Sequence, residues 1–437
     1  MISKPLVFAA ISDIAGKTRG KAFPVSDLEK RLRRGVGWTP TNVQITCFDT
    51  IAPSPFAALG DLQIIPDPKA GAEVDFGDGG TVERFMIGDI QELDGTPWAF
   101  CTRSILKSAL ARLNAAGGIA LVSAFEHEFQ FPDSTAAPGE AYTLGGFSRR
   151  RHFGEALFAA LEQGGLTTDT FMKEYGPEQY EATNGPASGH RSADHAVILR
   201  ELTRMTALRC GERVSFSPIL DPASVGNGVH IHMSFTDASG APVTYDEEGP
   251  AGMSALTGAF IAGVLKYLDA IVALTAASDI SYLRLTPHRW SAAFNNLGFR
   301  DREASVRICP VQSGDAETRA RQYNFEYRAA DASASPYLTL AAIVHAGAQG
   351  IEDALPAPQA TSEDLSLVPP KDLARRGYLR LPQTLDEALC RFEQNPTVTG
   401  WFPKGFAELY TAHKRCEIAH LDGMTDAERC AAYRDVY

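Results

Sequence analysis

Apolar and polar positions alternate in two segments of this chain, LVSAFEHEFQF at residues 121–131 and GNGVHIHMSF at residues 226–235. Successive side chains of a β-strand point to opposite faces, so this period of two predicts strands with one apolar and one polar face. The polar face of the first carries an E-x-E pair, and that of the second an H-x-H pair. We therefore expect each strand to direct two ionisable side chains into one space.

Other segments repeat their apolar residues with the longer period of a helix. Each of these segments is long enough for several helical turns, and the first of them ends at two glycines. The stretch 352–370 is rich in proline and serine and predicts a loop, after which the chain is expected to be helical to its end. The predicted helices before that loop cover residues 103–118, 192–211, 253–277 and 336–355.

The first hundred residues differ from the rest because they predict short strands separated by glycine, proline and aspartate. PLVFAAISDIAGKTRGKAFP predicts strand, turn and strand with Gly16 at the turn, and LGDLQIIPDP, ERFMIGDIQEL and PWAFCTRS predict further strands. A chain of 437 residues exceeds a usual single core. We therefore expect two domains, residues 1–100 and 101–437, the second an α/β arrangement with its sheet curved around the polar side chains.

Composition excludes several classes of protein. The net charge of −12 and the pI near 5.4 disfavour nucleic-acid binding and favour a cytoplasmic protein. No segment is expected to reach the roughly 20 apolar residues of a membrane span, and the N-terminus lacks the pattern of a signal peptide. The seven cysteines show no C-x-x-C motif and are expected to be free thiols.

Ligand-type side chains occur in four segments of the predicted second domain. Any one of these motifs alone is more often a solvated face or a pair of satisfied histidines. However, unpaired carboxylates inside apolar strands would be costly, and four such segments together indicate bound cations. Oxygen-rich ligand sets suit Mg²⁺ or Mn²⁺ rather than structural zinc. The residues are Glu126, Glu128, Glu174, Glu181, His230, His232 and Glu326.

Four arginines accompany these motifs, at positions 284, 302, 307 and 328. The guanidinium group binds carboxylate or phosphate through two parallel hydrogen bonds and stays charged in a pocket. Cations together with arginines indicate anionic substrates, most simply a nucleoside triphosphate and a carboxylic acid. The alternative is that each arginine pairs with a surface acid, which is common and weakly stabilising.

The four motifs together resemble those of the glutamine synthetase family. FEHEFQF resembles its E-x-E-F-F-L-F strand, EYGPEQYE its E-x-G-x-G-Q-x-E hairpin, GNGVHIHMS its G-x-G-M-H-x-H-x-S strand, and FEYRAADASASPYL its E-F-R-x-x-D-x-x-x-N-P-Y-L segment. The resemblance covers essentially the whole chain. It implies an α+β fold, in which an amino-terminal β-grasp domain precedes a catalytic α/β domain with a curved, mostly antiparallel sheet.

This resemblance implies a role for each motif residue. One cation would be held by Glu128, Glu174 and Glu181, and a second, next to the nucleotide phosphates, by Glu126, His230 and Glu326. ATP would contact His232, Ser234, Arg302 and Arg307, and glutamate would contact Gly226, His230, Arg284 and Arg328. The catalytic side chains would be Arg302, Arg284 and His232.

The resemblance also implies the reaction and the assembly. ATP would phosphorylate the γ-carboxylate of glutamate, and an amine would displace phosphate to form an amide, with water excluded because it would hydrolyse the acyl phosphate. Two or more Mg²⁺ or Mn²⁺ ions would be needed for each site. Family members close each site between adjacent subunits, so a homo-oligomer of two stacked hexameric rings is expected.

Two departures from the family pattern concern the ammonium site. The segment RLTPHRW has Trp290 where the family pattern R-L-V-P-G-Y-E has a glutamate. In the family the second acid is an aspartate from the neighbouring subunit, in an F-D-G-S-S loop of the amino-terminal domain, and the corresponding loop here is GVGWTPT, with Trp38 close by. Loss of two acids weakens a site for ammonium, whereas indole adds apolar surface and a face for an alkylammonium. We expect a γ-glutamyl-amine ligase with Trp290 and Trp38 in its amine pocket, similar to γ-glutamylmethylamide synthetase.

Three alternatives remain at this stage. Glutamine synthetase itself, using ammonia, would require the two tryptophans to be packing residues and another acid to have moved in. A non-catalytic relative would be expected to have lost metal ligands, and this chain keeps six. A dimetal hydrolase would need no arginine cluster. In addition, DLSLVPP has Ser366 where some relatives carry a tyrosine that is adenylylated, so this modification is not expected.

Overall fold

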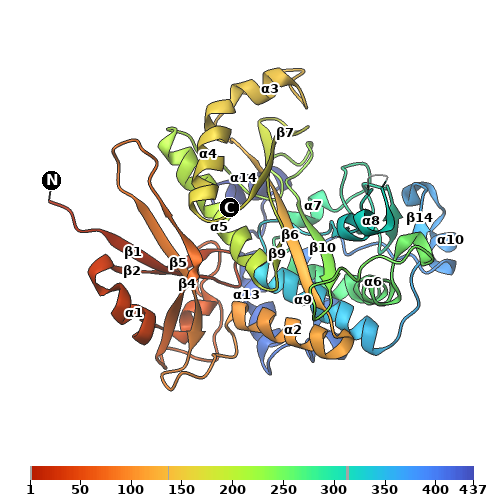
Figure 1. Cartoon of the computed structure of the whole chain (residues 1–437), viewed down its shortest axis with the longest axis horizontal. Helices are drawn as coiled ribbons and strands as arrows, with labels where there is room; N and C mark the ends of the chain where they lie inside the picture. The colour runs from red at the N-terminus through yellow and green to blue at the C-terminus, as the bar shows by residue number, and fades with distance from the viewer. Residues whose placement is uncertain (1, 136, 312–313) are drawn as a thin grey trace.

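A computed structural model describes residues 2–135, 137–311 and 314–437 of the chain (Figure 1). The amino-terminal sheet has the order β2-β1-β5-β4-β3, in which β1 and β5 are parallel and the other neighbours antiparallel. Helix α1 (Leu28–Arg34) packs against β4. This is the β-grasp arrangement that was expected. The strands are β1 (Leu6–Ser12), β2 (Thr18–Pro24), β3 (Val36–Trp38), β4 (Leu62–Val74) and β5 (Glu83–Gln91).

The larger sheet has the order β14-β11-β12-β13-β10-β6-β8-β7, with β9 also paired to β6. All pairings among its described strands are antiparallel except those of β11 with β12 and β14, so the expectation of a mostly antiparallel sheet is confirmed. Its strands are β6 (Ala120–Gln130), β7 (Thr168–Lys173), β8 (Gln179–Asn184), β9 (Ala187–Ser188), β10 (Val229–Thr236), β11 (Leu297–Phe299), β12 (Val306–Ile308), β13 (Phe325–Tyr327) and β14 (Ala360–Thr361).

Long helices cover the apolar face of this sheet. Helix α9 packs against both α2 and α6, and α5 packs against β6. These four helices are the ones predicted from helical periodicity: α2 (Thr102–Gly117), α5 (Arg191–Arg209), α6 (Ala255–Thr275) and α9 (Pro336–Glu352). The remaining helices are α3 (Leu144–Arg149), α4 (Arg151–Gln163), α7 (Ser281–Arg284), α8 (Ala316–Gln322), α10 (Pro370–Arg375), α11 (Leu385–Glu393), α12 (Pro396–Thr399), α13 (Phe406–His420) and α14 (Asp426–Arg434).

Helix α6 corrects one expectation. By length and composition it is apolar enough to cross a membrane, whereas the sequence was expected to contain no such segment. Of its most apolar window, 72% is buried inside the protein, where α6 packs against α9 and α11. Its apolar character is therefore that of a core helix surrounded by other helices.

The start of α2 corrects another expectation. PWAFCTRS was predicted to be a strand, but only Pro97 forms a bridge, to Gln91, and α2 begins at Thr102. The predicted turn at Gly16 is confirmed: it connects β1 and β2 with φ of +72°. Only glycine adopts this conformation readily, and a Cβ there would lie 2.5 Å from the carbonyl oxygen of Ser333.

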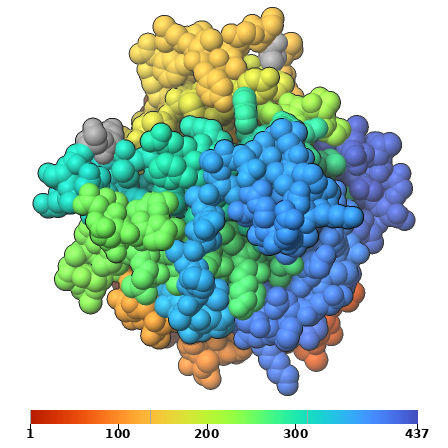
Figure 2. Space-filling model, turned by 90° about the vertical axis from the view of Figure 1, so that its right-hand side faces the viewer, coloured from red at the N-terminus to blue at the C-terminus, as the bar shows by residue number. Residues whose placement is uncertain are grey.

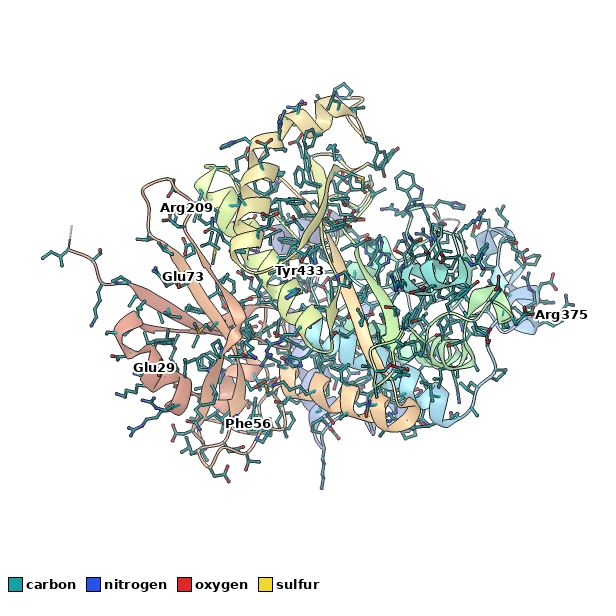
Figure 3. The ribbon with its side chains drawn as sticks, in the orientation of Figure 1. Glu29, Phe56, Glu73, Arg209, Arg375 and Tyr433 are labelled. Atoms are coloured by element: carbon teal, nitrogen blue, oxygen red, sulfur yellow. The ribbon has the colours of Figure 1, made fainter. Side chains whose placement is uncertain are left out.

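Ion pairs connect the small sheet to the catalytic part. Arg103 of α2 bonds Asp194 of α5 and reaches Asp67 of β4. Arg209, at the end of α5, pairs with Glu83 of β5; Figure 3 labels Arg209. The carboxy-terminal residues (blue) form much of the face shown in Figure 2, with the small domain behind it. These contacts fix the two sheets relative to each other in one chain.

Candidate active site

The two motif strands β6 and β10 are neighbours, which brings their polar pairs together. Their antiparallel register places His230 opposite Glu126, and on the other side of β6 the register places Glu181 of β8 opposite Glu128. Directly paired residues share a face of the sheet. One face at the centre of the sheet therefore carries carboxylates and imidazole together, as the period of two predicted.

Strands β13 and β12 extend this row of side chains. Glu326 lies opposite His232 on one side and opposite Arg307 on the other. Arg328 follows two residues after Glu326 and shares its face. Acidic and basic side chains of the site thus alternate across the four adjacent strands β6, β10, β13 and β12.

Burial explains why these residues face outwards. In β6 the odd-numbered positions, such as Phe125 and Phe129, are buried against the helices, whereas Glu126 and Glu128 are half-buried on the other face. Strand β10 alternates in the same way, with Ile231 and Met233 inside. The apolar side chains must be covered by the helical layer, so the ionisable ones are left facing a cavity.

This ligand cavity has a volume of about 580 Å³. Most of the residues that line it are polar or charged, and the aromatic side chains of Tyr142 and Trp290 also line it. It is lined by Glu126, Glu128, Tyr142, Met172, Glu174, Glu181, His230, His232, Trp290, Arg302, Arg307, Glu326 and Arg328. Eleven of the fifteen predicted site residues are among them. Three more, Gly226, Arg284 and Ser234, line the adjoining spaces described below, and Trp38 lies elsewhere.

Three carboxylates converge at one end of the cavity. Oxygen atoms of Glu128, Glu174 and Glu181 lie within 4.8 Å of one another. Burial and the charge of Glu174 raise the pKa of Glu128 to about 7. Burial and the charges of its carboxylate neighbours raise the pKa of Glu181 to about 9.

Burial first, and the neighbouring carboxylates second, raise the pKa of Glu128 and of Glu181, so this space disfavours further negative charge. Glu128 accepts hydrogen bonds from the backbone N–H of Gly228 at 2.7 Å and from Gln179 at 3.1 Å, and Glu174 accepts one from the Tyr142 hydroxyl at 2.8 Å. These neutral donors do not balance three charges. An oxygen-rich group of this kind fits a hard divalent cation, which would take the place of the protons.

A second group contains Glu126, His230 and again Glu181, with ligand atoms within 4.8 Å. Glu126 lies 3.5 Å from Nδ1 of His230 and 3.1 Å from Nε2 of His232. Burial opposes ionisation of Glu126, but the two imidazoles outweigh it and hold its pKa well below the usual range. This group also fits a divalent cation, and Glu181 lies between the two groups.

Glu326, which was expected beside Glu126 and His230, is held by other residues. Its carboxylate lies 2.7 Å from Arg307, 2.6 Å from Arg328 and 3.0 Å from His232. Burial alone would raise the pKa of Glu326, but these cationic neighbours hold it well below the usual range. Glu326 forms a third potential ligand group with His232 and Cys309, whose sulfur lies 3.5 Å from Nδ1 of His232. Sequence reasoning missed Cys309, although it follows Arg307 by two residues and so shares its face.

A narrower space opens beside the three carboxylates, where Arg284 and Gly226 lie together. Arg284 is buried and donates to Ser291 at 3.0 Å and to the carbonyl oxygen of Ala330 at 2.6 Å. A Cβ at position 226 would lie 2.2 Å from the carbonyl oxygen of Pro218 and 2.9 Å from the Arg284 side chain. Glycine is therefore required for the loop to approach the arginine this closely.

A second cavity of about 340 Å³ adjoins the first and shares Glu126 and His232 with it. Ser234 lines it, one period further along β10. Sequence reasoning missed its other polar walls, which come from β7, the end of β8, the end of α8 and the segment after it. These walls include Asp169, Thr183, Asn184, Arg321, Tyr323 and Asn324.

The two tryptophans expected in the amine pocket lie in different places. Trp290 lines the ligand cavity, is 47% exposed, and meets the ring of Tyr175 edge to face with ring centroids 4.6 Å apart. Trp38 is buried in the core of the small domain, with Lys21 6.0 Å above its ring. A single chain therefore does not bring Trp38 to this cavity, because the inward face of β3 directs its indole into the small domain's own core.

Comparison with known proteins identifies the class to which this site belongs. The glutamine synthetase catalytic domain matches residues 99–433, and the glutamine synthetase N-terminal domain matches residues 4–98. The chain belongs to the glutamine synthetase family. It is thus an ATP-dependent ligase of a family that uses ATP, glutamate and divalent metal ions.

Relatives of this chain include a protein named as a gamma-glutamylpolyamine synthetase and others named as glutamine synthetases. Gamma-glutamylpolyamine synthetase GlnA3 of Streptomyces coelicolor is 31% identical over 445 residues, which cover 99% of this chain and 93% of that protein. Type-1 glutamine synthetase 1 of Dictyostelium discoideum is 28% identical over 382 residues, covering 80% and 74% of the two chains.

Solved structures share the fold over the whole chain. The crystal structure of a novel glutamine synthase homolog has a TM-score of 0.91 and 38% identity, covering 100% of this chain and 99% of that one. The complex of GmaS with ADP has a TM-score of 0.80 and 24% identity, covering 98% and 96%, and shows a common fold.

Proposed function

We propose that this ligase joins the γ-carboxylate of L-glutamate to a primary amine, releasing ADP and phosphate. The observation that carries the proposal is the position of Trp290, whose exposed indole lines the ligand cavity together with Glu174 and Arg302. Indole offers apolar surface to an organic substituent and a π-face to an alkylammonium. The name of the Streptomyces coelicolor relative supports a γ-glutamyl-amine product.

The alternative function, glutamine synthetase with ammonia as its substrate, would require another acid in place of the missing one. The acids that line the described part of the ligand cavity are Glu126, Glu128, Glu174, Glu181 and Glu326. All five are already accounted for as proposed ligands of cations. The arrangement therefore favours an amine with an organic substituent over ammonium.

We assign the substrates to the spaces around the central carboxylates. Glutamate would lie beside Arg284, Arg328, His230 and the backbone of Gly226, because guanidinium groups bind carboxylates through paired hydrogen bonds. ATP would occupy the second cavity, next to Ser234 and His232, with Arg302 and Arg307 directed at its phosphoryl groups. This order places the γ-carboxylate of glutamate between the nucleotide and Trp290.

Each step of the proposed reaction uses fixed charge. The oxygen of the γ-carboxylate attacks the terminal phosphorus of ATP, ADP leaves, and the amine nitrogen then attacks the acyl carbon and expels phosphate. Arg302 and Arg307 stabilise charge on the phosphoryl oxygens without rearranging, and Arg284 keeps the acid in place. Cations held by Glu128, Glu174 and Glu181, and by Glu126 and His230 together with Glu181 or Glu326, would supply further positive charge to the same oxygens.

We further propose Mg²⁺ or Mn²⁺ as the cations, the cytoplasm as the location, and a homo-oligomer of stacked rings as the assembly. In one chain the small domain lies on the far side of α5 from α7 and α8 (Figure 1). Arg284 of α7 lines the narrower space and Arg321 of α8 lines the second cavity, both next to the ligand cavity. The small domain of a neighbouring subunit could therefore complete the cavity wall near Trp290. Such head-to-tail contacts close into rings.

The proposal is tested by measuring ADP release with a panel of amines and saturating glutamate and ATP. The panel contains ammonia, methylamine, ethylamine, longer alkylamines, an arylamine and a polyamine. We expect at least one organic amine to exceed ammonia in kcat/KM by about tenfold, which corresponds to ~1.4 kcal/mol of transition-state binding. Ammonia as the best substrate would replace the proposal by glutamine synthetase.

A further inference from the structure

One carboxylate holds the loop that carries Trp290. Oε2 of Glu303 accepts a hydrogen bond from the backbone N–H of His288 at 3.1 Å, and Oε1 accepts one from the backbone N–H of Trp290 at 3.2 Å. Both loop residues have left-handed backbones, with φ of +62° and +51°. Non-glycine residues rarely adopt this conformation, so the loop needs an external partner to keep it.

The other contacts of the loop connect it to the substrate site. The carbonyl oxygen of Trp290 accepts from Arg328 at 3.3 Å, and Arg328 also pairs with Glu326. Arg289, between the two strained residues, donates to the carbonyl oxygen of Ser224 at 2.6 Å. The loop is thus attached to the proposed glutamate site on one side and to Glu303 on the other.

Glu303 itself lies behind the loop. It lines a separate cavity of about 380 Å³ together with Asp301, Glu363 and His288, and the described lining of the ligand cavity does not include it. The backbone N–H of Glu303 bonds Asp301 at 2.9 Å, which fixes the start of its own turn. Its carboxylate therefore acts on the loop backbone and does not touch a substrate in the ligand cavity.

We infer that Glu303 is a positioning residue that sets the place of Trp290 in the amine pocket and thereby the preference for an amine with an apolar substituent over ammonia. The inference rests on the proposed function in one respect, the contact between Trp290 and the amine. The attachment of the loop to Glu303 is inferred only from the two hydrogen bonds and the backbone angles of His288 and Trp290. A carboxylate suits this role because it offers one oxygen to each of two N–H donors.

Amide hydrogen exchange tests the attachment without any substrate. We expect exchange at the N–H groups of His288 and Trp290 to become about tenfold faster in Glu303→Ala, because two charge-assisted hydrogen bonds are lost. Glu303→Gln retains one acceptor and should show an intermediate effect. Glu363→Ala removes an equal charge from the same cavity and should leave both rates unchanged. Unchanged rates in Glu303→Ala, or equal acceleration in Glu363→Ala, would overturn the inference.

A double-mutant cycle tests whether Glu303 acts through Trp290. Glu303→Ala should lower kcat/KM for the best amine by about tenfold relative to ammonia, with KM for ATP unchanged. In a Trp290→Ala background the same substitution should have little further effect on this ratio, because the side chain it positions is absent. Additive effects of the two substitutions would show that Glu303 acts independently, and the inference would be wrong.

The two measurements separate this inference from the proposed function. If ammonia is the best wild-type substrate, the proposed function fails, while accelerated exchange at His288 and Trp290 would still establish the attachment. If Glu303→Ala does not fold, as judged by circular dichroism, the Glu303→Gln variant carries both tests. Normal exchange rates and normal selectivity in Glu303→Gln would then overturn the inference.

Discussion

Glu128 of β6 and Glu181 of β8 lie directly opposite each other on antiparallel strands, and burial together with neighbouring charges raises the pKa of both. Opposed like charges destabilise a sheet unless something neutralises them. In this chain the pair stands beside Glu174 in a cavity that also contains arginines. The strand register therefore brings two carboxylates together at a position that favours binding of a cation.

The pH dependence of metal binding follows from these pKa values. In the metal-free protein the folded state holds protons on Glu128 up to about pH 7 and on Glu181 up to about pH 9, whereas the unfolded chain releases them near the ordinary pKa of 4.5. The free energy of unfolding therefore decreases as pH rises from about 4.5 to about 7 for Glu128, and from about 4.5 to about 9 for Glu181. The decrease is up to about 1.4 kcal/mol per pH unit for each of the two groups that is protonated in the folded state and ionised in the unfolded chain. A cation displaces the protons and removes this loss of stability.

We expect Mn²⁺ or Mg²⁺ to raise Tm more at pH 9 than at pH 6, measured by thermal unfolding with the metal ion and with EDTA. Equal increases at both values would contradict the assignment.

Substitution of the proposed ligands should abolish activity. Glu128→Ala leaves one cation with two of its three carboxylates, and Glu181→Ala removes a ligand from both groups. We expect a loss of more than about a hundredfold in kcat from either substitution. Glu155→Ala, on the exposed face of α4, is the matched control and should be fully active. The measurement is ADP release as a function of metal concentration. Full activity of either ligand variant, or of the wild type in EDTA, would exclude the two-cation site.

Placing an acid at position 290, as in the family pattern R-L-V-P-G-Y-E, should shift the substrate preference towards ammonia. Trp290→Glu replaces an apolar wall by a carboxylate that can bind ammonium, so the ratio of kcat/KM for ammonia to that for ethylamine should rise by about tenfold, or ~1.4 kcal/mol. Trp290→Phe keeps an aromatic ring without charge and should change the ratio much less. Because an alkylammonium has a higher pKa than ammonium, the wild-type rate with an amine should increase through the alkaline range. An unchanged ratio in Trp290→Glu would remove Trp290 from the amine pocket.

Assembly into rings should be required for activity. The small domain of the same chain does not bring Trp38 to the ligand cavity, so a neighbouring subunit is expected to complete the site. We expect light scattering to give the mass of a closed ring or of two stacked rings, with activity falling on dilution below the assembly threshold. A monomer that converts glutamate and ATP at the full rate would refute this prediction.

Local alternation was enough to predict which side chains share the site. Glu126 with Glu128, and His230 with His232, face one cavity because residues two apart in a strand point the same way, whatever the strands pair with. The apolar residues between them also specified which face the helices would cover. For the same reason the helices α2, α5, α6 and α9 could be predicted from periodicity, since each buries a wide apolar surface.

Strand order and loop contacts were decided only by the tertiary structure. The local sequence does not show that β8 pairs with β6, so the sharing of Glu181 between two ligand groups could not be predicted. The position of Glu326 among Arg307, Arg328 and His232 could not be predicted either. Trp38 was expected to reach the amine pocket from a neighbouring subunit, and within one chain packing buries it in the small domain. The attachment of Trp290 to Glu303 joins residues on either side of a strand, and it exists because a folded loop directs two N–H groups at one carboxylate. Side-chain type and spacing are properties of the chain, whereas these relationships depend on which distant segments the core brings together.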